Sequence, residues 1–82
     1  MNNAKLLTQE QLKDPTILEK IRRLTEDIVW HMRTKEAYNL SLNLEKSLES
    51  ANLKAVAPKL SQEYESIIVR LKLTGLPMLG DE

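Results

Sequence analysis

The chain has no cysteine and no phenylalanine, and its aromatic residues are one tryptophan and two tyrosines. The absence of cysteine excludes disulfide bonds and thiolate metal ligands. The shortage of aromatic residues disfavours a β-sandwich, whose strands are rich in β-branched and aromatic side chains. Glycine and proline number only two and three, so few positions interrupt regular secondary structure. With fifteen leucines, the composition predicts an all-α protein.

An excess of charge of one sign is also missing, because twelve basic residues balance twelve acidic ones. A protein built mainly to bind nucleic acid has a basic excess, so this balance argues against that function. No apolar run approaches the roughly 20 residues of a membrane-spanning helix. The N-terminal sequence MNNAKLL has neither the apolar core of a signal peptide nor a transit-peptide pattern. We therefore expect a cytoplasmic or nuclear protein that does not bind membranes.

The length of the chain is that of a single small domain, residues 1–82. Such a domain buries only about 60–65% of the surface that its unfolded chain exposes, so its core alone gives a thin margin of stability. Neither disulfides nor thiolate-bound metal can add stability here. Association with another chain is therefore the expected supplement.

Two capping signals lie near the N-terminus. Thr8 and Gln11 match a capping box, which predicts a short helix over about residues 9–13; a frayed arm over residues 1–14 is the alternative. Asp14 followed by Pro15 is typical of a helix start, because the aspartate can accept a backbone hydrogen bond and proline suits the first helical position.

Three residues delimit the C-terminal half. Asn52 is expected to end a helix in the left-handed region, with 53–57 as a connecting segment. Pro58 then begins a helix over 58–74, which Gly75 caps after a basic last turn. In the tail over 75–82, the apolar stretch 76–79 is expected to pack on its own helix end, with docking into a partner as the alternative.

The central segment contains two apolar series with helical spacing. The first series comprises Ile17, Ile21, Leu24, Ile28 and Met32. The second series, whose face Trp30 shares, comprises Ala37, Leu40, Leu44, Leu48 and Ala51. On one straight helix the two series point in nearly opposite directions.

This change of face has two structural solutions. The chain can turn near Thr34, so that three helices close a three-helix bundle. Alternatively, one helix runs over 15–51 and pairs with the C-terminal helix as an antiparallel hairpin. Because residues 31–38 contain no glycine, proline or asparagine, we favour the continuous helix. The first series then has no partner within the chain, which predicts assembly into a larger helical bundle.

The C-terminal segment has the clearest periodicity. Its apolar residues alternate in steps of four and three, the pattern of a coiled-coil seam. The seam comprises Leu53, Ala57, Leu60, Tyr64, Ile67 and Leu71.

Residues suited to catalysis are few. His31 is the only histidine, and Asp27 one turn before it gives at most two metal ligands on one helical face. The adjacent carboxylates Glu26 and Asp27 point about 100° apart and cannot act as a pair. The chain has no nucleophile elbow and no glycine-rich phosphate loop. We therefore expect a protein that is not an enzyme, with no cofactor and no metal site.

The unpartnered apolar series predicts a protein-binding module, such as an adaptor, a regulator or a structural subunit. Its partner would be another protein or a second copy of the chain. Tryptophan is also the residue type most often found as an interface hot spot. The expected interface residues are Ile17, Ile21, Leu24, Ile28, Trp30 and Met32.

Two other functions follow from the basic residues. Arg22 and Arg33 are eleven residues apart and lie on nearly the same helical face, so a small helical enzyme or ligand-binding protein could hold an anion between them. Nucleic-acid binding is less favoured, because acidic residues interleave with the basic ones and no aromatic platform is present. The basic cluster for that function comprises Lys20, Arg22, Arg23, Arg33 and Lys35.

Overall fold

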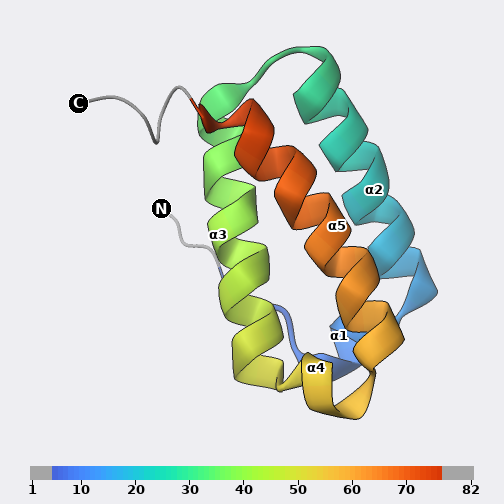
Figure 1. Ribbon diagram of the computed structural model, residues 1–82. Coiled ribbons are helices and arrows are strands. Elements are labelled where there is room, and N and C mark those ends of the chain that lie inside the picture. Colours follow the sequence, from blue (N-terminus) through green and yellow to red (C-terminus); the bar gives the residue numbers. More distant parts are fainter. Residues whose placement is uncertain (1–4, 77–82) are drawn as a thin grey trace.

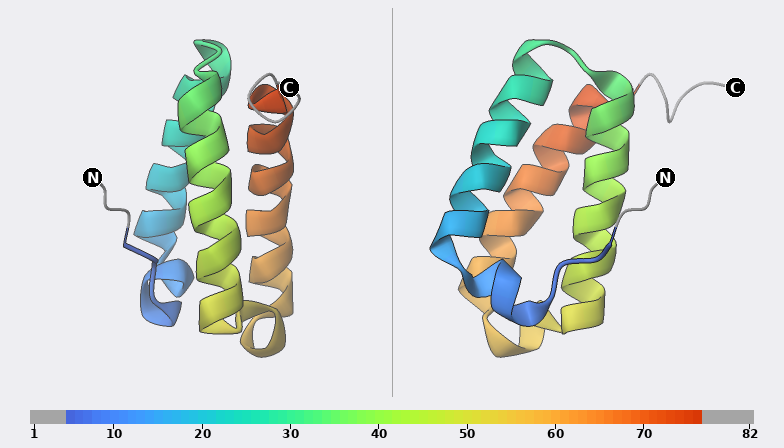
Figure 2. Two further views of the ribbon diagram at one scale, coloured as in Figure 1. Left: turned by 90° about the vertical axis from the view of Figure 1, so that its left-hand side faces the viewer. Right: turned by 180° about the vertical axis from the view of Figure 1, so that it is seen from behind.

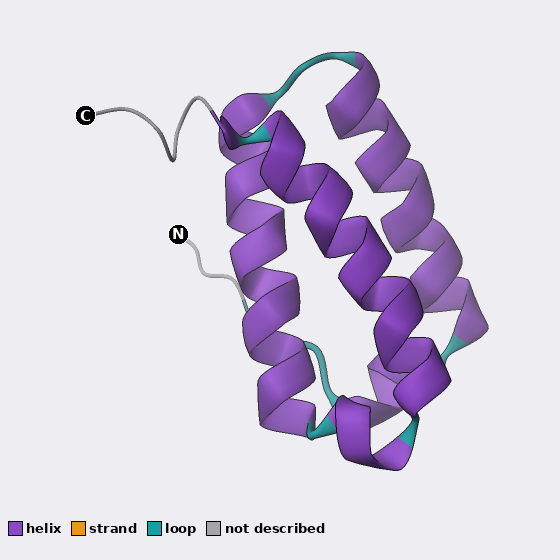
Figure 3. Cartoon of the chain, in the orientation of Figure 1, coloured by secondary structure: helices purple, strands orange, loops and turns teal. Residues whose placement is uncertain are grey.

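A computed structural model of the protein describes residues 5–76, and every regular element in this range is a helix (Figures 1 and 3). The all-α prediction is therefore confirmed for these residues. Three long helices run up, down and up to form a bundle whose largest dimension is 36 Å. The elements are α1 (Gln9–Lys13), α2 (Pro15–Trp30), α3 (Thr34–Ala51), α4 (Leu53–Val56) and α5 (Pro58–Thr74).

The predicted continuous helix over 15–51 is wrong, because α2 ends at Trp30 and α3 begins at Thr34. The end of α2 is a Schellman turn. In this turn the Arg33 N–H donates to the Ile28 carbonyl at 3.0 Å, and the Met32 N–H donates to the Val29 carbonyl at 3.1 Å. Met32 has a φ of 53°, in the left-handed region that glycine usually occupies. A continuous helix would be about 55 Å long and would not fit within the bundle.

Helices α3 and α5 share the most extensive contact in the described chain and supply most of its buried apolar residues. The seam residues Tyr64, Ile67 and Leu71 of α5 are buried, and Ser61 and Ile68 are buried beside them on the side that faces α3. An ion pair between Lys72 and Glu45 joins the two helices at the surface. The buried apolar residues of α3 and α5 are Ala37, Leu44, Leu48, Tyr64, Ile67, Ile68 and Leu71.

Two ion pairs join helix α2 to α5. Arg22 donates to Glu63 at 2.8 Å, and Arg70 donates to Glu26 at 2.5 Å. The hydrogen bond from Arg70, together with its positive charge, holds the pKa of the Glu26 carboxyl below its ordinary value. The buried residues of α2 are Ile21, Thr25 and Ile28.

One end of the bundle, which we call the closed end, is sealed by α1 and α4 (Figure 1). Leu12 of α1 and Leu53 of α4 are fully buried there. The Tyr64 hydroxyl of α5 is also buried and donates to the Leu12 carbonyl at 2.6 Å. The segment before α1 is fixed to α3, because the Leu7 N–H donates to the Ser47 hydroxyl at 2.9 Å.

Several helix ends match their sequence signals. Thr8 and Gln11 form the capping box that begins α1, and the Asp14 carboxylate accepts from the Thr16 N–H at the start of α2. Asn52 ends α3 with a φ of 54°, in the left-handed region. The part of the predicted tail over 77–82 lies outside the described residues.

Gly75 caps α5 for a different reason from the one predicted. Its φ is −88°, which any residue adopts, so backbone freedom is not what this position requires. A Cβ atom here would lie 3.1 Å from the backbone nitrogen of Tyr38 and 3.3 Å from the carbonyl oxygen of Thr34. The glycine therefore lets the end of α5 approach the first turn of α3.

Candidate functional site

The turn at Met32 lets part of the first apolar series be buried within the chain. Because α2 folds back against α3 and α5, Ile21 and Ile28 are buried in the core and Ile17 is half-buried. The expectation that this series lacks a partner within the chain is therefore wrong. The other three predicted interface residues remain exposed. The exposed fractions are 48% for Leu24, 83% for Trp30 and 69% for Met32.

Exposed apolar side chains gather at the end of the bundle opposite the closed end, which we call the open end. The α2–α3 turn presents Trp30 and Met32 there, the last turn of α5 presents Leu73, and Leu76 follows the Gly75 cap. The three most exposed large apolar residues of the described chain belong to this group. Figure 1 shows the turn and the end of α5 at the same end of the molecule.

The backbone of the α2–α3 turn is fixed although its apolar side chains lie in water. Three consecutive N–H groups, those of His31, Met32 and Arg33, donate to carbonyls of the last turns of α2. A methionine in the left-handed region costs roughly 1–2 kcal/mol relative to a residue without that steric clash. Non-glycine residues held in such a conformation cluster at functional sites. The open end therefore combines exposed apolar residues with a strained backbone.

A second exposed apolar surface is the groove between α2 and α3, on the face that α5 does not cover. Seen from that side, α2 and α3 run next to each other with α5 behind them (Figure 2, right). Two adjoining hollows of about 320 and 260 Å³ share the residues Leu24, Leu40 and Asn43. The remaining apolar lining of this α2–α3 groove consists of Leu7, Ile17, Ile21, Ile28 and Leu44.

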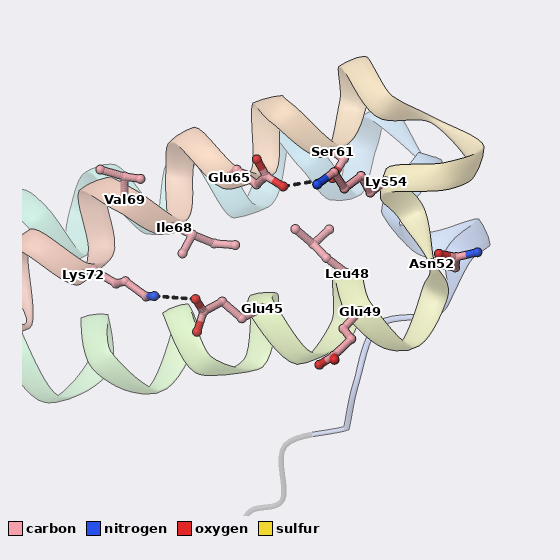
Figure 4. Close-up of a pocket in the computed structure, with 10 residues that line it drawn as sticks. All are labelled: Glu45, Leu48, Glu49, Asn52, Lys54, Ser61, Glu65, Ile68, Val69 and Lys72. Carbon is pink, nitrogen blue, oxygen red and sulfur yellow. Dashed lines mark hydrogen bonds and ion pairs between the residues drawn. The ribbon is translucent and has the colours of Figure 1, made fainter.

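A third hollow, of about 560 Å³, lies between α3 and α5 (Figure 4). Leu48 and Ile68 point into the space between the two helices. Its polar lining includes three glutamates and two lysines, and the ion pair between Lys72 and Glu45 crosses it. This hollow is therefore less apolar than the α2–α3 groove.

The two arginines proposed to bind an anion do not share a cavity. Arg22 points toward α5, where Glu63 neutralises it. Arg33 lines the α2–α3 groove, with its Nε atom 3.8 Å from the Asp27 carboxylate. The turn at Met32 separates the two side chains, which a continuous helix would have aligned.

The remaining candidate groups make local contacts. The His31 imidazole lies 3.4 Å from the Asp27 carboxylate on the exposed surface of α2. Within residues 5–76, no three histidine, aspartate or glutamate side chains are grouped so that they could hold a metal ion. No helix in the same range is long and apolar enough to cross a membrane.

Comparison with known proteins gives no relative from which a site could be transferred. The chain matches no family model, and it has no significant similarity to a curated protein or to a solved structure.

The position of Leu73 and Leu76 at the open end was not predicted from the sequence. Leu73 and Leu76 lie outside the coiled-coil seam, which contains Leu71. Leu73 is two residues beyond Leu71, about 200° around the helix, so it cannot point into the same core. This departure from the seam was the available signal.

Proposed function

We propose that the protein is a non-enzymatic protein-binding module that acts as an adaptor, regulator or structural subunit and contacts its partner through the open end. The observation that carries the proposal is the α2–α3 turn, where Trp30 and Met32 lie in water on a strained backbone. A glycine at Met32 would relieve the strain, so stability alone does not account for methionine there.

The chemistry of the open end suits a protein partner. Tryptophan and methionine are enriched at protein interfaces, and tryptophan contributes most often to hot spots. The fixed backbone of the turn means that little conformational entropy is lost when a partner binds. Leu73 in the last turn of α5 and Leu76 after the Gly75 cap are further exposed apolar side chains at this end of the bundle.

The test is quantitative capture of proteins from the source cell with three immobilised forms of the chain. These are the wild type, the double variant Trp30→Ala/Met32→Ala, and the control Val56→Ala, which truncates an exposed apolar residue at the closed end. We expect proteins that the wild type and the control retain and the double variant loses. Equal capture by all three forms would contradict the proposal.

A purified partner allows a second measurement. Trp30 is the only tryptophan of the chain, so its fluorescence reports on the open end without a label. We expect a blue shift of the emission on binding, because the partner removes the indole from water. Binding without any change in this emission would place the contact elsewhere on the molecule.

A further inference from the structure

The charged residues of the α2–α3 groove differ in sign between its two hollows. Lys20 lines one hollow, whereas Asp27, Glu36 and Arg33, whose Nε lies 3.8 Å from Asp27, give the other a net charge of −1. Leu24 lies in the middle of the groove and is half-exposed. Lys20 comes four residues before it and Asp27 three residues after it, and both line the groove. Seven residues are two helical turns, so the cation and the anion are about 10 Å apart along α2.

The charges on one α2 helix are complementary to those on a second α2 helix that runs in the opposite direction. When two α2 helices cross antiparallel with their Leu24 side chains in contact, each lysine faces the aspartate of the other helix. The two ion pairs then flank a central apolar contact. The same two-fold axis repeats both pairs, as a closed interface between identical chains requires.

We propose that the α2–α3 groove binds a second copy of this chain, with the two α2 helices antiparallel and Lys20 of each copy paired with Asp27 of the other. This interface is separate from the open end and goes beyond the proposed function. It buries the half-exposed Leu24 and covers the open groove. A second copy also supplies the added stability that a domain of this size gains from association.

A parallel arrangement of the two copies is less favourable. It places α2 of one copy against α3 of the other at the same height along the bundle. Asp27, Arg33 and Glu36 line one hollow, with a net charge of −1, and Lys20 lines the other, so the parallel arrangement places hollows of like charge against each other. Like charges at an interface oppose association, so the charges select the antiparallel arrangement.

The test is the molar mass in solution, measured by light scattering on a size-exclusion column over a range of concentrations. The wild type should approach twice the chain mass of 9.4 kDa as its concentration rises. Lys20→Asp places two aspartates opposite each other at both ends of the interface, and Asp27→Lys does the same with lysines. Each variant should weaken the dimer at least about tenfold.

Mixing the two charge variants separates the proposed contact from general damage. In an equimolar mixture, each new aspartate meets a new lysine and each original lysine meets an original aspartate, so the mixture should form a heterodimer. The control Lys59→Asp changes the charge of an exposed residue of α5 outside the groove, and it should leave the dimer intact.

Each other outcome overturns the proposal. A wild type that stays monomeric at all concentrations has no second copy in the groove, and loss of a foreign partner from Lys20→Asp would then assign the groove to that partner. A dimer that neither charge variant weakens, or a mixture that fails to associate, contradicts the pairing. The variant Trp30→Ala should remain dimeric, so failure here is distinguishable from failure of the proposed function.

Discussion

The two ends of the bundle differ in how far their large apolar side chains are buried. At the closed end, Leu12, Leu53 and Tyr64 are fully buried, and a hydrogen bond at 2.6 Å ties α5 to α1. At the open end, Trp30 and Leu73 lie largely in water. Burial of an apolar side chain contributes roughly 1.5–3 kcal/mol to stability, which an exposed one does not. The closed end therefore stabilises the fold, and the open end is available for binding.

The largest expected difference between the ends comes from the same substitution made at each. Leu12→Ala removes a fully buried side chain and should lower the free energy of unfolding by about 2–5 kcal/mol. Leu73→Ala truncates a side chain that is 62% exposed and should change it by less than about 0.5 kcal/mol. Chemical denaturation with unchanged m-values measures both. Similar losses at the two positions would contradict the assignment of stability to the closed end.

Tyr64→Phe tests the hydrogen bond that seals the closed end. The variant leaves the Leu12 carbonyl without its donor, so the free energy of unfolding should fall by about 1–2 kcal/mol at neutral pH. Denaturation of the wild type and the variant in parallel measures this loss. If the free energy of unfolding hardly changes, water must reach the closed end and donate to the Leu12 carbonyl in place of the hydroxyl.

The same tyrosine predicts a pH dependence. Burial raises the pKa of the Tyr64 hydroxyl above its ordinary value of about 10. The unfolded chain therefore loses this proton at a lower pH than the folded chain. The corresponding stability is fully present below about pH 10 and is lost as the pH rises further. The stability difference between wild type and Tyr64→Phe should accordingly shrink in alkaline solution.

Signals local in the sequence predict most helix ends correctly. The capping box of Thr8 and Gln11, the pair Asp14–Pro15 and the left-handed Asn52 each act within a few residues. Their effect therefore does not depend on the tertiary fold. The coiled-coil seam of α5 is predictable for a similar reason, because its spacing alone defines the buried face.

The turn at Met32 could not be predicted in this way, because the local preference opposes it. A methionine in the left-handed region costs roughly 1–2 kcal/mol. Burial of Ile21 and Ile28 gains roughly 1.5–3 kcal/mol for each residue, and that gain exists only once α2 has folded back. Tertiary packing therefore outweighs the local cost. The surfaces that depend on this turn, including the open end, were correspondingly hard to predict.

Met32→Gly tests whether the open end is maintained at the expense of stability. Glycine relieves the strain at a φ of 53° but also increases the freedom of the unfolded chain, so the net gain should be about 0.5–1 kcal/mol. Met32→Ala is the matched control, because it removes the same exposed side chain and keeps the strain. Thermal unfolding followed by circular dichroism compares the two. If glycine and alanine give equal stability, the turn is not strained.

The smallest effect on stability is expected from the loss of the largest side chain. Trp30→Ala removes an indole that is 83% exposed, so the free energy of unfolding should change by less than about 0.5 kcal/mol. Because the variant has no tryptophan, circular dichroism must follow its unfolding. A loss above about 1 kcal/mol would mean that the indole packs on the bundle and that the open end also stabilises the fold. If the variant keeps its stability but no longer binds a partner, the open end is needed for binding and not for folding. The closed end would then be the one that stabilises the fold.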